Sequence, residues 1–271
     1  MLFFVGIKDD IIGTAAVKKL LSHFLVGFIL VVMANVRIES MHGIFGIGEL
    51  EEWQSIFLSI FVYIVIVNSY NLIDGVDGLA GGIGFINAIF FGLWFYFSGN
   101  VPMALLSAVL AGALLGFLFF NFSPAKIFMG DSGSLIIGAI ICVLAIEMIS
   151  DVGKNKIDIR PEWFDYISKP IYAMSVLVYP LVDTIRIFTI RLLKGQSPLS
   201  ADKNHLHHRL LSLGMSHKVT CFVIYMYSIT VVLLTLLLPN DTPTFTFLSS
   251  FCIAFAFVGV LFLFKPKSKH A

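Results

Sequence analysis

Charged residues are scarce in this sequence. They make up 13% of its 271 residues, whereas a soluble domain typically carries about 25%. Hydrophobic residues make up 58%, and the mean hydropathy is +0.93. A soluble chain this apolar would lack the polar side chains needed to cover its surface. The composition therefore excludes an ordinary soluble domain and predicts a membrane protein.

An excess of one charge sign and a cysteine framework are also lacking. The net charge of +1 at pH 7 indicates no nucleic-acid partner. No cleavable signal peptide is visible, because Met1–Gly6 is short and follows no basic region. All three cysteines lie inside apolar runs, so we interpret them as lipid- or core-facing and not as disulfides or metal ligands; they are Cys142, Cys221 and Cys252.

Long apolar runs are abundant. Eight stretches of 17 to 21 residues approach the roughly 20 residues that cross a bilayer as a helix. The runs are continuously apolar and do not alternate, which favours helices. We therefore predict an all-α, polytopic membrane protein with about eight transmembrane helices. The stretches are Leu20–Val36, Gln54–Tyr70, Leu79–Ser98, Met103–Phe122, Gly133–Ile149, Pro170–Ile190, Val219–Leu238 and Thr244–Phe264.

Basic residues divide unevenly between the two sides of this topology. The side of Lys8 and Lys18 receives 13 of the 18 Lys and Arg residues, which predicts that this side is cytoplasmic. Four polar segments fall on the same side, and residues 191–218 form a cytoplasmic loop. Because chance would scatter such segments over both sides, we predict a single cytoplasmic active site.

The first two polar segments carry carboxylates and amides. The adjacent acids of the first crowd negative charge that a divalent cation or a basic partner relieves, although a solvated helix end is the simpler interpretation. The second, Asn68–Gly82, places amides and acids at three-residue steps with glycines between them. This pattern suits a metal-bound, phosphorylated substrate, and the alternative is a plain turn. The residues are Asp9, Asp10, Asn68, Asn71, Asp74 and Asp77.

The third segment, Asn121–Ser134, places Asp131 at the predicted start of a helix. The free N–H groups and the dipole there favour anions, and Asp131 with Mg²⁺ is suited to hold a diphosphate. The alternative is that Asp131 or Ser132 is an N-cap.

The fourth segment reads H-x-H-H, with a basic residue directly after it. Histidine and arginine act as charge partners and donors beside phosphates. Zinc is the alternative ligand, which the absence of a nearby cysteine disfavours. The residues are His205, His207, His208 and Arg209.

These four segments, in this order and spacing, resemble the polyprenyl-phosphate N-acetylhexosamine-1-phosphate transferase superfamily (glycosyltransferase family 4). The signature elements are the acidic pair, N-x-x-N-x-x-D-G-x-D-G, F-M-G-D-S-G-S and H-L-H-H, and the resemblance covers roughly residues 3–217. H-x-H-H after P-x-x-x-D-K, which begins at Pro198, is similar to the undecaprenyl-phosphate GlcNAc-1-phosphate transferase branch. The branch that uses UDP-MurNAc-pentapeptide typically has three consecutive histidines and is the alternative.

The resemblance implies one transmembrane catalytic domain over residues 1–271, in the inner (plasma) membrane. It implies a UDP-N-acetylhexosamine donor, a polyprenyl-phosphate acceptor, UMP release and Mg²⁺ or Mn²⁺, as the first membrane step of cell-envelope glycan synthesis. The protein partner that we consider is a second copy of this chain, in a homodimer. The implied catalytic residues are Asp9, Asp10, His205, His207 and His208; the implied metal ligands are Asp131 and Asp74; the implied substrate contacts are Lys19, Asn68, Asn71, Asp74, Asp77, Phe128, Arg191 and Arg209.

Relatives usually have two or three further helices before the acidic pair, so we expect a version of this chain extended upstream to be more active. A transporter is the main rival class. It is disfavoured because transporters place ionisable groups near the bilayer midplane. Here the acids cluster at one surface, and only Asp183 with Arg186, an i, i+3 pair, is expected within the membrane. An inactive membrane scaffold is the third alternative.

Overall fold

The computed structural model describes residues 1–150, 164, 166–196, 205–238 and 242–263. Over these ranges the chain is helical and forms no strand, which confirms the predicted all-α fold. The elements are α1 (Leu2–Ile12), α2 (Ala16–Phe28), the π-helical turn η1 (Ile29–Met33), the 3₁₀ turn η2 (Ile44–Gly46), α3 (Glu52–Leu72), α4 (Leu79–Ser98), α5 (Val101–Asn121), α6 (Gly130–Ser150), α7 (Lys169–Val176), α8 (Val178–Leu193), α9 (Leu206–Ser212), α10 (His217–Leu236) and α11 (Pro243–Leu263).

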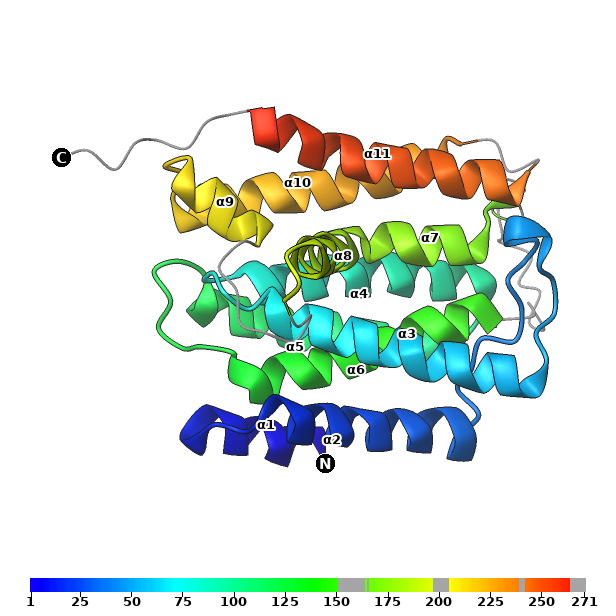
Figure 1. Ribbon diagram of the computed structural model, residues 1–271, viewed down its shortest axis with the longest axis horizontal. Helices are drawn as coiled ribbons and strands as arrows, with labels where there is room; N and C mark the ends of the chain where they lie inside the picture. The colour runs from blue at the N-terminus through cyan, green and yellow to red at the C-terminus, as the bar shows by residue number, and fades with distance from the viewer. Residues whose placement is uncertain (151–163, 165, 197–204, 239–241, 264–271) are drawn as a thin grey trace.

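Six helices of the described chain are long and apolar enough to cross a membrane. They are α3, α4, α5, α6, α10 and α11, each of 20 or 21 residues. Figure 1 shows them running along the long axis of the molecule. The chain is thus a multi-pass membrane protein, and the predicted count of eight is not confirmed. The other two predicted stretches, Leu20–Val36 and Pro170–Ile190, each fall on two shorter elements.

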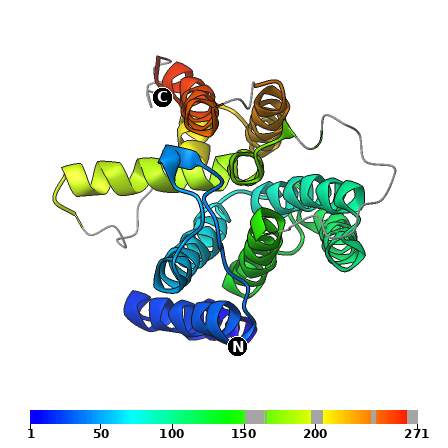
Figure 2. The same ribbon diagram turned by 90° about the vertical axis from the view of Figure 1, so that its right-hand side faces the viewer.

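The stretch Pro170–Ile190 is not one spanning helix. α7 ends at Val176 and α8 begins at Val178, with Leu177 between them at φ −87° and ψ 13°. Pro180 explains the break: it has no N–H for the Val176 carbonyl, yet proline is tolerated in the first turn of a new helix. Figure 2 shows α8 (yellow-green) lying sideways, whereas most of the spanning helices are seen obliquely or nearly end-on. The prediction of a single span here is wrong.

Close contact between their backbones fixes the positions of α3 and α6 relative to each other. A Cβ on Gly138 of α6 would lie 2.9 Å from the Cα of Val67 in α3. Small residues allow such approach between membrane helices, where packing takes the place of hydrophobic driving force. α3 and α6 therefore hold a fixed register. At the left of Figure 1, α3 ends and α6 begins in polar loops, and the α1–α2 turn and α9 lie at the same end.

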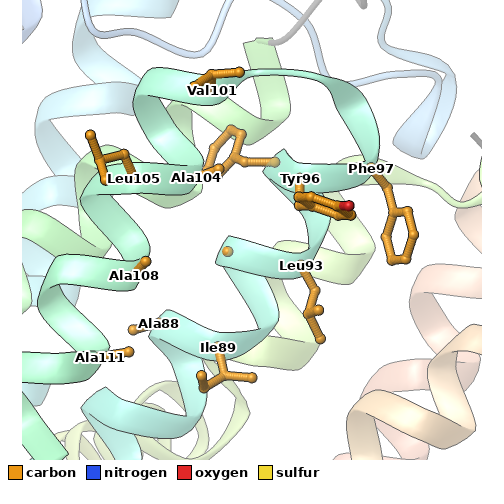
Figure 3. Close-up of a pocket in the computed structure, with 12 residues that line it drawn as sticks. Ala88, Ile89, Leu93, Tyr96, Phe97, Val101, Ala104, Leu105, Ala108 and Ala111 are labelled. Atoms are coloured by element: carbon orange, nitrogen blue, oxygen red, sulfur yellow. The ribbon is translucent and has the colours of Figure 1, made fainter. Parts of the chain in front are cut away.

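An apolar cavity of about 580 Å³ lies between α4 and α5. Figure 3 shows Ala88, Leu93, Ala104 and Leu105 among the side chains that line it. No charged side chain lines it, so it is separate from the polar segments.

Candidate active site

Lys19 of α2 lies at the centre of a polar cluster built from four helices. Its ammonium donates to the Oδ1 atom of Asn71 in α3 at 2.9 Å and forms an ion pair with Asp131 in the first turn of α6. The Oδ2 atom of Asp9 in α1 lies 3.4 Å from the same nitrogen. The structure therefore brings three of the predicted motifs together on one basic residue. We call Asp9, Lys19, Asn71, Asp74 and Asp131 the Lys19 cluster.

Asn71 orients the carboxylate of Asp131. Its Nδ2 atom donates to Asp131 Oδ1 at 2.5 Å and to Ser134 Oγ at 3.1 Å. Asn68 was predicted to act beside Asn71, but it donates to the Ile64 carbonyl of its own helix at 2.7 Å. Residues three apart on a helix are rotated by about 60° from each other. Of the two amides, the structure brings Asn71 to the carboxylates.

The adjacent residues Asp9 and Asp10 have different contacts. Asp9 faces Lys19, whereas Asp10 accepts the backbone N–H groups of Asp131 at 2.8 Å and Ser132 at 3.2 Å. Asp10 thereby caps α6 from a neighbouring helix and meets its positive dipole end. The alternative that Asp131 or Ser132 is the N-cap is wrong, because α6 begins at Gly130 and both lie inside its first turn.

Gly6 makes this cap geometrically possible. A Cβ on Gly6 would lie 2.4 Å from the Cα and backbone nitrogen of Ser132, so α1 rests directly on the α6 backbone. Asp10 follows Gly6 by four residues, which places both on one face of α1. The glycine contact and the carboxylate cap therefore together hold α1 against α6.

The turn between α3 and α4 carries Asp74 and Asp77. Burial, and then the charges of Asp131 and Asp10, raise the pKa of Asp74 to about 7. Asp77 has other partners: its Oδ2 atom accepts a backbone N–H of the loop before α6 at 3.3 Å and lies 3.4 Å from His217 Nδ1. Asp74 thus interacts with the carboxylates, while Asp77 connects the turn to that loop and to α10.

The three histidines of the H-x-H-H motif lie together at the start of α9. The rings of His205 and His207 stack with centroids 5.4 Å apart, and the His208 ring lies 4.3 Å from that of His207. Burial lowers the pKa of His207 to about 3, so its imidazole is neutral. A Cβ on Gly75 would lie 2.6 Å from His207 Nε2. The histidines therefore contact the same turn that carries Asp74.

Two side chains of α8 hold these rings, and the motif analysis assigned neither of them a role. The Oδ2 atom of Asp183 lies 2.8 Å from His205 Nδ1, and the hydroxyl of Tyr179 lies 3.2 Å from His207 Nδ1. Tyr179 and Asp183 are four residues apart and share a helix face. We call Tyr179, Asp183, His205, His207 and His208 the histidine cluster.

The other predicted residues lie around these two clusters. Phe128, in the loop before α6, is 79% exposed, which leaves its ring open to a ligand. Arg191 is buried near the end of α8, and the Arg209 guanidinium lies 5.1 Å from the centre of the Phe262 ring in α11. The P-x-x-x-D-K residues that precede the histidines, Pro198, Asp202 and Lys203, lie outside the described residues.

The acids of the Lys19 cluster have the chemistry of a hard-cation site. In the arrangement that the structure shows, the described side chains include no group of three His, Cys, Asp or Glu residues that could hold a metal ion. Asp9 and Asp74 nevertheless both interact with Asp131, and Lys19 is the cation that Asp9 and Asp131 share. Oxygen donors with this excess of negative charge fit Mg²⁺ or Mn²⁺.

A model of glycosyl transferase family 4 matches residues 1–149. The chain belongs to this family. The family-4 match contains all of the Lys19 cluster, whereas the histidine cluster lies beyond it. The family expected from the motifs is thus confirmed.

Three relatives bear related names. The chain is 37% identical to the decaprenyl-phosphate N-acetylglucosaminephosphotransferase of Mycolicibacterium smegmatis over 233 residues, which cover 82% of this chain and 57% of that protein. The protein of the same name from Mycobacterium tuberculosis is 36% identical with the same coverage. The undecaprenyl-phosphate alpha-N-acetylglucosaminyl 1-phosphate transferase of Escherichia coli is 28% identical over 80% of this chain and 58% of that protein. The chain therefore spans less than two thirds of these relatives.

Proposed function

We propose that this protein transfers N-acetylglucosamine-1-phosphate from UDP-GlcNAc to a polyprenyl phosphate and releases UMP. One observation carries the proposal: Asp9, Asn71 and Asp131 converge on Lys19 at one end of a bundle of apolar helices. A charged site at the end of membrane helices suits one lipid-borne and one water-borne reactant, both anionic. The names of the relatives supply the sugar and the lipid class.

The reaction joins two negatively charged groups. An oxygen of the polyprenyl phosphate attacks the β-phosphorus of the UDP-sugar, and the bond from that phosphorus to the oxygen of the leaving UMP breaks. Charge cancellation and alignment are then the main tasks of the protein. Lys19 carries the positive charge of the cluster; its ammonium binds the carboxylates of Asp9 and Asp131 and would offset phosphate charge once the substrates bind.

Asp131 and Asp74 would hold Mg²⁺ or Mn²⁺. When bound, the ion neutralises diphosphate charge and favours departure of UMP. Asn71 keeps the Asp131 carboxylate oriented for this purpose. The adjacent turn with Asp77 and the exposed ring of Phe128 are assigned to the nucleotide, the latter by stacking on uracil.

Asp9 is the better placed of the acidic pair to receive the acceptor phosphate, because the carboxylate of Asp10 is already bound to two backbone N–H groups. We favour direct attack, with Asp9 as the general base. A covalent aspartyl intermediate is the alternative. Arg209 offsets phosphate charge and the histidines hydrogen-bond to phosphate oxygens. The active site faces the cytoplasm of the inner membrane, as the Lys and Arg distribution indicates.

The test is a UMP-release assay with purified protein, undecaprenyl phosphate and Mg²⁺. UDP-GlcNAc and UDP-MurNAc-pentapeptide are offered separately and in competition. We expect UMP from UDP-GlcNAc, none when the lipid phosphate is omitted, and little from the pentapeptide donor. Preference for the pentapeptide donor would reject the sugar assignment and retain the reaction class. Absence of UMP with either donor would reject the proposed function.

A further inference from the structure

Asp183 is a buried carboxylate with three polar neighbours. Its side chain is 1% exposed. Its Oδ2 atom lies 2.8 Å from His205 Nδ1, and its Oδ1 atom accepts the Leu206 backbone N–H at 2.8 Å. The Arg186 guanidinium lies 3.5 Å from the same Oδ1 atom. A carboxylate placed between a backbone donor and a guanidinium is stabilised in its ionised, acceptor-only form.

This arrangement decides where His205 carries its proton. An ionised carboxylate has no hydrogen to give, so the short contact requires a proton on His205 Nδ1. When the imidazole is neutral, its Nε2 atom then bears the lone pair and can take up a proton; the resulting imidazolium donates Nε2–H to a phosphate oxygen and is stabilised by the Asp183 carboxylate. Asp183 thus sets the tautomer of the ring as well as its position.

Tyr179 provides a contrast one helical turn earlier. Its hydroxyl lies 3.2 Å from His207 Nδ1. A phenol hydroxyl both donates and accepts, so this contact holds the His207 ring without choosing its tautomer. The helix break at Leu177 turns α8 across the bundle (Figure 2). Both side chains contact the histidines from this helix.

We propose that Asp183 is a positioning residue that fixes His205 with its proton on Nδ1 and directs Nε2 to the substrate phosphates. The proposal rests on the proposed function for the identity of the substrate. It also assigns a purpose to the broken helix, since an unbroken helix over residues 169–193 would carry Asp183 in a different direction. Asp183 acts through His205 and touches no substrate itself.

The decisive variant is Asp183→Asn, which keeps the shape of the side chain. Its amide oxygen still accepts the Leu206 N–H, but its NH₂ group faces His205 and donates to Nδ1. We expect the proton of His205 to move to Nε2 and kcat to fall at least about tenfold, while KM changes by less than about threefold. Thr184→Val is the matched control, because Thr184 neighbours Asp183 on α8 and donates to Ser69 instead. The control is expected to leave both readouts near wild type.

The tautomer is read by ¹⁵N NMR of protein labelled in its seven histidine rings, at alkaline pH where imidazoles are neutral. The His205 signal is assigned by its loss in His205→Asn. An unchanged tautomer in Asp183→Asn, or a changed tautomer with unchanged kcat, would overturn the proposal. Because the tautomer is read without substrate, an inactive wild-type protein would reject the proposed function while this readout still decides the role of Asp183.

His205→Asn covers the case in which Asp183→Asn does not fold. The asparagine amide takes the place of Nδ1–H toward Asp183 and lacks any counterpart of Nε2. We expect this variant to fold and to lose at least about tenfold in kcat. Wild-type kcat in this variant would show that the pair is purely structural and would overturn the proposal.

Discussion

The two polar clusters at this end of the molecule differ in burial. In the Lys19 cluster, the side chains of Lys19 and Asp131 are 14% and 21% exposed. In the histidine cluster, those of His205 and Asp183 are 5% and 1% exposed. The first cluster combines three acidic side chains with one ammonium and is partly open to solvent. The second is a closed network in which each side chain already has a protein partner.

The difference indicates a division of labour. Partly exposed charges can exchange a protein partner for a ligand, whereas buried hydrogen-bonded groups keep one geometry because an unmet polar contact there is costly. We infer that the Lys19 cluster binds the reacting groups and that the histidine cluster presents fixed donors and acceptors to them. Variants of the two clusters should therefore fail in different ways.

The largest effect is expected for Asp131→Asn. The amide keeps the shape of the carboxylate but loses the charge for Lys19 and for a divalent cation. We predict UMP release below about a tenth of wild type at saturating Mg²⁺, since even about 1.4 kcal/mol of lost transition-state stabilisation is tenfold in rate. Binding of Mn²⁺, followed by electron paramagnetic resonance, should weaken in parallel. Activity above a tenth with unchanged Mn²⁺ binding would make Asp131 a structural residue.

Asp9→Asn and Asp10→Asn should separate function from stability. Asp9 faces Lys19, so its variant is expected to lose at least about tenfold in rate with little change in thermal midpoint. Asp10 caps α6, so its variant is expected to lower the free energy of unfolding by about 1 kcal/mol. Rate and thermal midpoint are measured on the same preparations. Equal losses of stability in both variants would contradict the assigned split.

Gly6→Ala tests the close packing of α1 on α6. The added methyl would overlap the Ser132 backbone, so we predict destabilisation of about 1–3 kcal/mol and a reduced rate as the acidic pair shifts. Gly112→Ala in α5 is the matched control, because nothing lies within 4 Å of its added Cβ. A helical alanine there should be neutral or stabilising by up to about 1 kcal/mol. Similar thermal midpoints for the two variants would show that α1 is free to move.

The smallest effect is expected for Gly75→Ala, which presses on the end of the His207 side chain. The overlap is with a ring atom and not with backbone, so we predict a rate loss of about threefold to tenfold and a fall in thermal midpoint smaller than that of Gly6→Ala. A loss as large as that of Asp131→Asn would mean that the turn, and not the ring, is what the reaction depends on.

The sequence predicted the convergence of the polar segments because alternating spans return the chain to the same side. Asn71 and Asp131 could be chosen from their motifs, and Lys19 from the family resemblance. The split between Asp9 and Asp10 could not be predicted, since neighbouring helical residues point in different directions and the position of α6 decides which of them meets it. The same limit applies to Asn68, which hydrogen-bonds within its own helix and whose contact with the substrate stays a prediction.

Pro180 was a local signal for the helix break at Leu177. The span over Pro170–Ile190 was nevertheless predicted as one helix because the stretch is continuously apolar. Asp183 stood out in the sequence as a charged residue in an apolar stretch, three residues from Arg186, but nothing there paired it with His205. Asp183 lies 22 residues before His205, and the pairing depends on the crosswise direction of α8. Contacts of this kind follow from tertiary packing and not from any periodicity in the sequence.

The proposed transfer of a sugar phosphate is tested most directly by identifying which bond of the donor breaks. UDP-GlcNAc labelled with ³²P at the β-phosphorus distinguishes transfer of a sugar phosphate from transfer of the sugar alone. With undecaprenyl phosphate and Mg²⁺, we predict that the label enters the lipid product in amounts equal to the unlabelled UMP released. Label that remains in the nucleotide as UDP, with sugar on the lipid, would contradict it.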